Sequence, residues 1–128
     1  MKISYKLIVA FAAGIAIGGS VIQGLHAQAT PPTYAFVEIN NISDPDGLKT
    51  IGPKAGPAVA AFGGKFLTHG NAPVTAVDGT PPARFVVIAF DSLAKAQAWR
   101  VSAAQMEVDG IIRKTAKLRE FFVEGIAQ

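Results

Sequence analysis

The sequence of 128 residues contains no cysteine. This absence excludes a disulfide framework, a thiolate nucleophile and a zinc or iron–sulfur site with cysteine ligands. A bacterial lipoprotein is excluded as well, because its lipid is attached to a cysteine. Half of the residues are apolar, which is enough for the core of one domain of ordinary size.

A strong charge of one sign is lacking too. The chain has a formal net charge of +3, but Lys2 and Lys6 lie in a segment that we expect to be removed. Without them, the chain has ten Lys and Arg residues and nine Asp and Glu residues, which gives a net charge of +1. The basic residues that lie close together are typical of a solvated helix face; they are Arg113, Lys114, Lys117 and Arg119. We therefore expect no nucleic-acid partner.

The N-terminal residues 1–29 have the pattern of a secretory signal peptide. Lys2 and Lys6 form a positive start, an uncharged stretch follows over 7–22, and Ala27-Gln28-Ala29 supplies small residues for a signal peptidase. We expect cleavage after Ala29 and a short extended leader over 30–33. The mature protein is then exported, to the periplasm or to the medium.

An uncleaved membrane anchor is the alternative for this segment. The uncharged run continues to Leu25, close to the roughly 20 residues that a bilayer span needs. Several glycines and Ser20 dilute the run, and the cleavage motif is well placed, so the sequence favours cleavage. Contact with a membrane is expected only through this segment, if it stays uncleaved.

Four strands are predicted in the mature domain. Residues 34–40 alternate between apolar and other side chains, as a half-buried strand does. The second strand runs over 65–69 and, after an interruption, continues over 74–77. The third, 84–90, is apolar on both faces and is expected in the middle of a sheet. Residues 119–123 form the last strand.

The first helical region lies between the first two strands. Asp44-Pro45 supplies an N-cap and a proline in the first helical position. Because proline inside a helix removes a hydrogen bond, we expect two pieces, the second beginning near Pro53 or Pro57. Gly63-Gly64 ends the region with the positive φ that favours glycine.

The second helical region begins at the cap Asp91-Ser92 and restarts at Ser102. Its first piece has an apolar stripe of Leu93, Ala96 and Trp99. In its second piece the residues predicted to share a face are Val108, Ile111, Thr115 and Leu118.

The order β-α-β-β-α-β predicts an α+β, ferredoxin-like domain over 34–128. In that topology the first and third strands lie in the middle of a four-stranded antiparallel sheet, and the helices cover one face. The strand 84–90 would then expose apolar side chains on the other face. A second copy of the chain is the expected cover, which gives a homodimer paired through the sheet face.

Short motifs along the domain stand in the order and spacing of a known family. They are Asp44-Pro45, Phe62-Gly63-Gly64-Lys65-Phe66, Asp78-Gly79, Phe90-Asp91-Ser92, Ala96 with Ala98-Trp99, Ser102 and Val123-Glu124-Gly125. Together they resemble the domain of unknown function 1330 family over about Tyr34 to Gly125. The resemblance implies a ferredoxin-like domain that forms a dimeric α/β barrel. It implies no activity, because none is assigned to the family.

Related dimeric barrels include cofactor-independent monooxygenases, lactone isomerases and dye-decolourising haem peroxidases, which is an analogy of fold alone. At four polar positions of the family pattern this sequence has other residues, namely His69, Ala89, Gln105 and Ile112. The resemblance therefore carries no pocket chemistry over to this chain.

Three residues are candidates for a functional site. His69, the one histidine outside the signal segment, is a candidate general base, but a single histidine cannot build a histidine-rich metal site. Trp99 and Phe36 are candidates for lining a ligand pocket, with packing on the sheet as the alternative for Trp99. Glu38 and Glu124 would form a carboxylate pair only if the first and last strands brought them together. We expect no metal and no cofactor.

Three functions remain open on these grounds. The first is an exported homodimer that binds a small apolar molecule between sheet and helices. The second is a cofactor-independent enzyme, similar to a monooxygenase or an isomerase, that acts on a small aromatic or lactone-like substrate with His69 as base. The third is a purely structural or interaction module with a filled interior.

Overall fold

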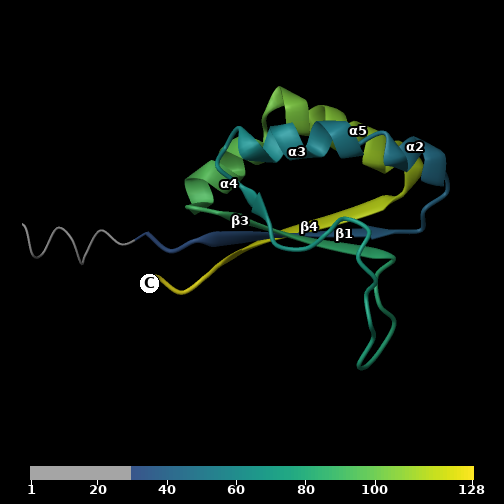
Figure 1. Cartoon of the computed structure of the whole chain (residues 1–128), viewed down its shortest axis with the longest axis horizontal. Helices are drawn as coiled ribbons and strands as arrows, with labels where there is room; N and C mark the ends of the chain where they lie inside the picture. Colours follow the sequence, from purple (N-terminus) through teal and green to yellow (C-terminus); the bar gives the residue numbers. More distant parts are fainter. Residues whose placement is uncertain (1–29) are drawn as a thin grey trace, which may run out of the picture. The chain divides into compact units, whose positions relative to one another are not determined.

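The computed structural model describes residues 30–128, and the predictions for the signal segment lie outside the described residues. Residues Pro31–Ala127 form one unit (Figure 1). Its elements are β1 (Thr33–Asn40), α2 (Pro45–Lys49), α3 (Gly52–Ala60), β2 (Lys65–Phe66), β3 (Arg84–Phe90), α4 (Leu93–Arg100), α5 (Ala103–Thr115) and β4 (Lys117–Glu124). Among the helices of this described part, none has both the length and the hydropathy that a bilayer span requires.

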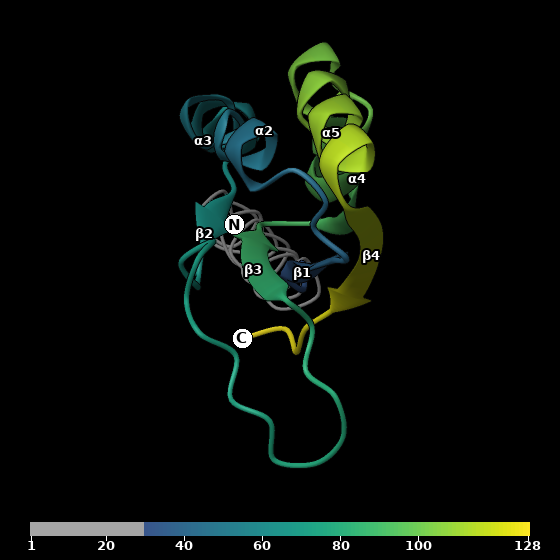
Figure 2. The ribbon, with the colours of Figure 1, turned by 90° about the vertical axis from the view of Figure 1, so that its right-hand side faces the viewer.

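The four strands form one antiparallel sheet in the order β2-β3-β1-β4. β1 and β3 lie in the middle, as predicted, and the helices lie on one side of the sheet (Figure 2). The domain therefore has the predicted ferredoxin-like α+β fold. In one row across the sheet, Val37 of β1 lies opposite Val86 on β3 and Glu120 on β4.

The sheet face toward the helices is the core face. Every second residue of β1, beginning at Thr33, is buried there, which follows from the period of two along a strand. The largest buried side chain is Trp99 of α4, whose ring centroid lies 5.2 Å from that of Phe90. Burying one large apolar side chain stabilises the fold by roughly 1.5–3 kcal/mol, so this pair is a main support of the helix layer.

The first helical region is divided as the sequence predicts. Asp44 caps α2 by accepting a hydrogen bond from the backbone N–H of Gly47 at 3.0 Å. The second piece, α3, begins at Gly52 and therefore at the first of the two proposed prolines, whereas Pro57 lies inside the helix. After α3, Gly63 has the predicted positive φ of 74°.

The second helical region also begins at its predicted caps. Ser92 accepts a hydrogen bond from the backbone of Lys95, and Ser102 accepts one from the backbone of Gln105. The predicted stripe of the second piece is partly wrong, because α5 ends at Thr115 and Leu118 belongs to β4. The buried face of α5 consists of Gln105, Val108, Asp109, Ile112 and Thr115.

The second strand is shorter than predicted, and residues 74–77 are not a strand. Beyond β2 the pairing with β3 continues for two residues only: Leu67 donates its backbone N–H to Val87, and the side-chain oxygen of Thr68 accepts from the backbone of Val87 at 3.0 Å. Because a side chain replaces the backbone in the ladder, the chain then leaves the sheet. Residues Leu67–Ala83 form a long loop, which we call the arm.

The arm and the second sheet face lie on the same side of the molecule. Figure 1 and Figure 2 show the arm projecting from the sheet on the side opposite the helices. The open face carries the residues that alternate with the core residues, among them Tyr34, Phe36, Phe85, Val87, Phe121 and Val123. Phe121 is 44 % and Val123 51 % exposed. Within residues 30–128, no helix covers this second apolar face of the sheet.

Candidate functional site

The residues singled out in the sequence are spread over the domain. Trp99 is buried between α4 and the sheet. Phe36 lies on the open face, where its ring centroid is 5.9 Å from that of Phe85. His69 is exposed on the arm. The carboxylates of Glu38 and Glu124 are not brought together, because Glu124 pairs in register with Thr33 at the other end of β1.

A cavity of about 60 Å³ lies between the sheet and the helices, and we call it the interior cavity. Its walls are largely apolar, and its polar lining comes from three residues, Trp99, Gln105 and Glu120. They belong to α4, α5 and β4. The core row across the sheet supplies Val37 and Val86, and the main apolar residues on the helix side are Ala55, Val59, Val108 and Ile112.

The polar residues of the interior cavity each have an atom without a partner. In the described part of the chain, the buried side-chain polar atoms that make no hydrogen bond are Thr33 Oγ1, Trp99 Nε1, Gln105 Oε1 and Glu120 Oε1. The last three belong to residues that line the interior cavity. A buried polar atom without a partner destabilises a fold by about 1–3 kcal/mol, so native proteins nearly always satisfy it.

From the end of α4, Arg100 holds Glu120 and also Asp109, the partner of Gln105. Its Nη1 donates to Oδ2 of Asp109, and its Nε donates to Oε2 of Glu120 at 2.5 Å. Both carboxylates are largely buried, with 7 % and 13 % of their side chains exposed. Arg100 thus joins α4, α5 and β4 through one guanidinium group, whose fork suits two carboxylates.

The orientation of the Gln105 side-chain amide follows from the same hydrogen-bond network. Its Nε2 donates to Oδ1 of Asp109 at 3.0 Å. An ionised carboxylate only accepts hydrogen bonds, so the amide nitrogen must face Asp109. The unpartnered atom of Gln105 is therefore its oxygen, an acceptor.

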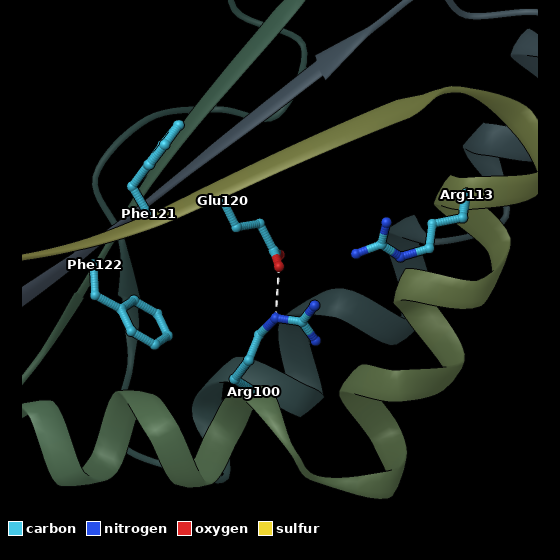
Figure 3. Close-up of a pocket in the computed structure, with 5 residues that line it drawn as sticks. All are labelled: Arg100, Arg113, Glu120, Phe121 and Phe122. Atoms are coloured by element: carbon cyan, nitrogen blue, oxygen red, sulfur yellow. Dashed lines mark ion pairs between the residues drawn. The ribbon is translucent and has the colours of Figure 1, made fainter.

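Glu120 also lines a second pocket, which we call the outer pocket. It has a volume of about 260 Å³ and is lined by Arg100, Arg113, Glu120, Phe121 and Phe122. Figure 3 shows the side chains of Arg100 and Arg113 pointing toward Glu120 from two helices. Glu120 is thus shared by the outer pocket and the interior cavity.

The protonation of Glu120 is set by opposing effects. Burial raises the pKa of Glu120 above its ordinary value, and the negative charge of Asp109 raises it further, while the guanidinium groups of Arg100 and Arg113 lower it. The net change is upward. A carboxyl group with these properties can exchange a proton or a hydrogen bond with a molecule in the cavity.

A third hollow, at the other end of β4, is less suited to a ligand. It is lined by Arg113, Lys117 and Arg119 among others. Arg119 is already paired with Glu38 at 3.5 Å and lies over the ring of Phe121. Within residues 30–128 there is also no group of three or more His, Cys, Asp or Glu side chains that could hold a metal ion. The interior cavity is therefore the candidate site.

Sequence reasoning found Trp99 but missed the polar residues beside it. A signal was available for Glu120, because the alternation of β4 places it on the core face between Leu118 and Phe122. Gln105 and Asp109 stand four residues apart on the buried face of α5. Arg100 gave no such signal, because it ends a short helix and its partners come from two other elements.

Similar structures exist, and their functions are unknown. A protein of unknown function from Rhodopseudomonas palustris has a TM-score of 0.57 at 15 % identity, covering 85 % of this chain and 94 % of its own. A methylated form of it has a TM-score of 0.58 at 13 % identity, covering 84 % and 90 %. At such identities the likeness supports the fold alone.

A conserved protein of unknown function from Bacteroides thetaiotaomicron, described as a possible oxidoreductase, has a TM-score of 0.46 at 11 % identity and covers 75 % of this chain and 99 % of its own. That likeness is too low to carry an argument. No curated protein matches the sequence.

A family model spans nearly the whole described domain. The model for the domain of unknown function DUF1330 matches residues 32–126. It covers the strands, the helices and every residue of the interior cavity. The chain therefore belongs to the DUF1330 family, as the motifs in its sequence predict.

Proposed function

We propose that this protein binds a small organic molecule in the interior cavity. One observation carries the proposal: Trp99, Gln105 and Glu120 line one otherwise apolar cavity, and each has a buried polar atom without a partner. Few convergent polar groups in an apolar enclosure are typical of ligand sites.

The size of the cavity bears on the enzyme hypothesis. A dry cavity of about 150 Å³ accepts benzene, and the interior cavity has about 60 Å³. An aromatic substrate would therefore require the walls to move apart. His69, the base of that hypothesis, is exposed on the arm and is absent from the cavity lining. These observations favour binding of a small molecule over turnover of an aromatic one.

The experiment uses Trp99, the only tryptophan in the chain, as the reporter. Its indole N–H gives a single resonance in a proton–nitrogen NMR spectrum of the mature protein. We expect that resonance to shift saturably with at least one organic probe of two or three heavy atoms, such as methanol or formamide, which fits a cavity of about 60 Å³. Ala55→Leu, which adds bulk at the cavity wall, should abolish the shift. Ala60→Leu, at an exposed site of the same helix, should preserve it. No saturable shift with any probe would refute the proposal.

We also propose that two copies pair through the open face. The face is apolar on three strands: Phe121, Phe36 and Val87 form one row across it, and Phe85 lies in the next row. Glu38 and Arg119 of this face are paired with each other at 3.5 Å, so a second copy would not leave either charge without a partner. The arm projects on this side, where it would reach a second copy (Figure 2).

Export remains a proposal that rests on residues 1–29 alone. The intact mass of the protein recovered from the periplasm of a producing bacterium would test it. We expect a chain that begins at Thr30, after the Ala27-Gln28-Ala29 motif. A full-length chain held in the membrane fraction would favour the uncleaved anchor instead.

A further inference from the structure

The outer pocket contains hydrogen-bond donors that the protein itself does not use. Within residues 30–128, the guanidinium group of Arg113 makes no hydrogen bond and no ion pair. Figure 3 shows this group directed from α5 toward Glu120, which Arg100 approaches from α4. Arg100 uses Nε and Nη1 for its two carboxylates, which leaves its Nη2 without a partner in the described chain. The pocket therefore offers the whole fork of Arg113 and one further nitrogen of Arg100.

Both guanidinium groups can be reached from the solvent. Arg113 is an exposed residue, and 29 % of the Arg100 side chain is exposed. The outer pocket has a volume of about 260 Å³, whereas a cavity of about 150 Å³ already accepts benzene. The pocket therefore has room for one ring with a small polar substituent.

The pocket also has an aromatic wall. Phe122 lines it and lies on the same face of β4 as Glu120, because side chains alternate along a strand. Figure 3 shows the side chain of Phe121 pointing to the other side of the strand, so its ring is not part of this wall. A ligand whose charged end meets Arg113 can place an apolar body against the ring of Phe122.

The charges around the pocket favour a ligand with one negative charge. A guanidinium group binds a carboxylate through two parallel hydrogen bonds. Burial raises the pKa of Glu120, and when Glu120 carries a proton, Asp109 balances Arg100 and the charge of Arg113 is left over. A phosphate dianion would bring two negative charges close to Glu120 and Asp109. A cation would meet two guanidinium groups and is disfavoured.

We propose that the outer pocket is a second binding site, which takes a small organic monocarboxylate. The carboxylate group accepts hydrogen bonds from Arg113 and from Nη2 of Arg100, and the apolar body of the ligand lies against Phe122. Glu120 borders both this pocket and the interior cavity, but the groups that bind the carboxylate do not line the interior cavity. The second site is therefore independent of the binding function proposed above.

Three planar probes of the same shape and different charge test the proposal: benzoate, benzamide and benzamidinium. Saturable shifts of the backbone amide resonances of Glu120 and Phe122 in the mature protein give their dissociation constants. At about pH 5.5 we expect benzoate to bind at least about tenfold more tightly than the other two, because it alone supplies a charged acceptor to the guanidinium groups. Equal affinities, tighter binding of another probe, or no saturable shift would overturn the proposal. The titration followed on Trp99 tests the interior cavity separately.

Two variants of neighbouring residues locate the binding of benzoate. Arg113→Met should weaken it about tenfold, and the variant should fold because Arg113 has no ion pair to lose within the described residues. Lys114→Met removes the same charge from an exposed residue that does not line the outer pocket, so the affinity should change less than about twofold. Equal losses in the two variants would show a general attraction of anions to α5 and would overturn the proposal.

Glu120 gives this binding a pH dependence of definite sign. A bound carboxylate adds a negative charge to that of Asp109 and raises the pKa of Glu120 further, against the opposing effect of Arg100 and Arg113. Binding therefore takes up protons, and the affinity for benzoate should rise at least about threefold between about pH 7.5 and about pH 5.5. Glu120→Gln should remove this dependence. An affinity that falls toward low pH, or the same dependence in Glu120→Gln, would contradict the proposal.

Discussion

Arg100 is the residue on which the polar side of the interior cavity depends. Its guanidinium group holds the buried carboxylates of Asp109 and Glu120 at once. Removing one member of a buried ion pair leaves its partner charged and without compensation, which is strongly destabilising. A pair on the surface contributes far less, because water and salt screen it.

We predict that Arg100→Met lowers the free energy of unfolding by about 3 kcal/mol, since two carboxylates lose their partner. Chemical denaturation measures the change. The matched control is Lys54→Met, which breaks the exposed pair of Lys54 and Glu107 at 2.8 Å. That change should amount to less than about 1 kcal/mol. Similar losses in the two variants would mean that Arg100 has no special role.

Glu120 should give the stability a pH dependence of definite sign. Its pKa in the folded protein is raised above the ordinary value of 4.5, so the folded state binds the proton more tightly than the unfolded state. The stability from this group is therefore fully present below pH 4.5 and is lost as the pH rises through the folded pKa.

Glu120→Gln removes this titration. The stability of the variant minus that of the wild type should therefore increase as the pH rises above 4.5. Denaturation curves recorded at several pH values between about 4 and 8 measure the difference. A difference that is constant or falls with pH would show that the carboxyl group is not destabilised by burial.

The contacts of single side chains are the part of the structure that the sequence predicts least well. Trp99 could be placed because it repeats at helical spacing with Leu93 and Ala96. The site around it depends on contacts between α4, α5 and β4 that are distant in the sequence, such as Arg100 with Glu120. A pattern of one or two periods identifies which face a residue lies on, but not which partner it meets there.

At the scale of elements, the turn after α3 shows how closely backbone and core approach. An added Cβ at Gly64 would lie 2.6 Å from the ring of Phe90 and 2.6 Å from the side chain of Val59. Gly56, inside α3, has open space around it. A side chain therefore has no room at Gly64 but has room at Gly56.

We predict that Gly64→Ala destabilises the fold by about 1–3 kcal/mol, because Phe90 and Val59 must move. Gly56→Ala should stabilise it by about 0.5–1 kcal/mol, because alanine restricts the unfolded chain and favours helix. Thermal unfolding of both variants measures the two shifts. Shifts of the same sign would contradict the close approach at Gly64.

The elements themselves could largely be predicted from the sequence. Caps and alternation are local signals, so Asp44, Ser92 and Ser102 gave the starts of three helices. The error in residues 74–77 has a physical cause: the side chain of Thr68 replaces the backbone in the ladder and ends β2. Whether a short apolar run joins a sheet depends on such pairing partners, which local sequence does not specify.

At the scale of the whole molecule, the proposed pairing through the open face can be tested by the oligomeric state. We predict that the mature wild-type protein is a dimer and that Phe121→Glu weakens it at least tenfold, because the variant places a charge in the centre of an apolar interface. Light scattering after size exclusion measures the mass. Val101→Glu, at a site 74 % exposed on the helix side, is the control and should remain dimeric. A monomeric wild-type protein would refute the pairing.

The arm has a kinetic consequence for such a dimer. It leaves the sheet at Thr68 and returns at Ala83, where Asn40 accepts a hydrogen bond from the backbone at 2.9 Å. Both of its ends are thus fastened to the sheet, while Val77 near its tip is fully exposed. If each arm wraps its neighbour, two separately labelled pools of protein, once mixed, should exchange subunits slowly. Shortening the arm should then accelerate that exchange far more than it alters the folding of either subunit.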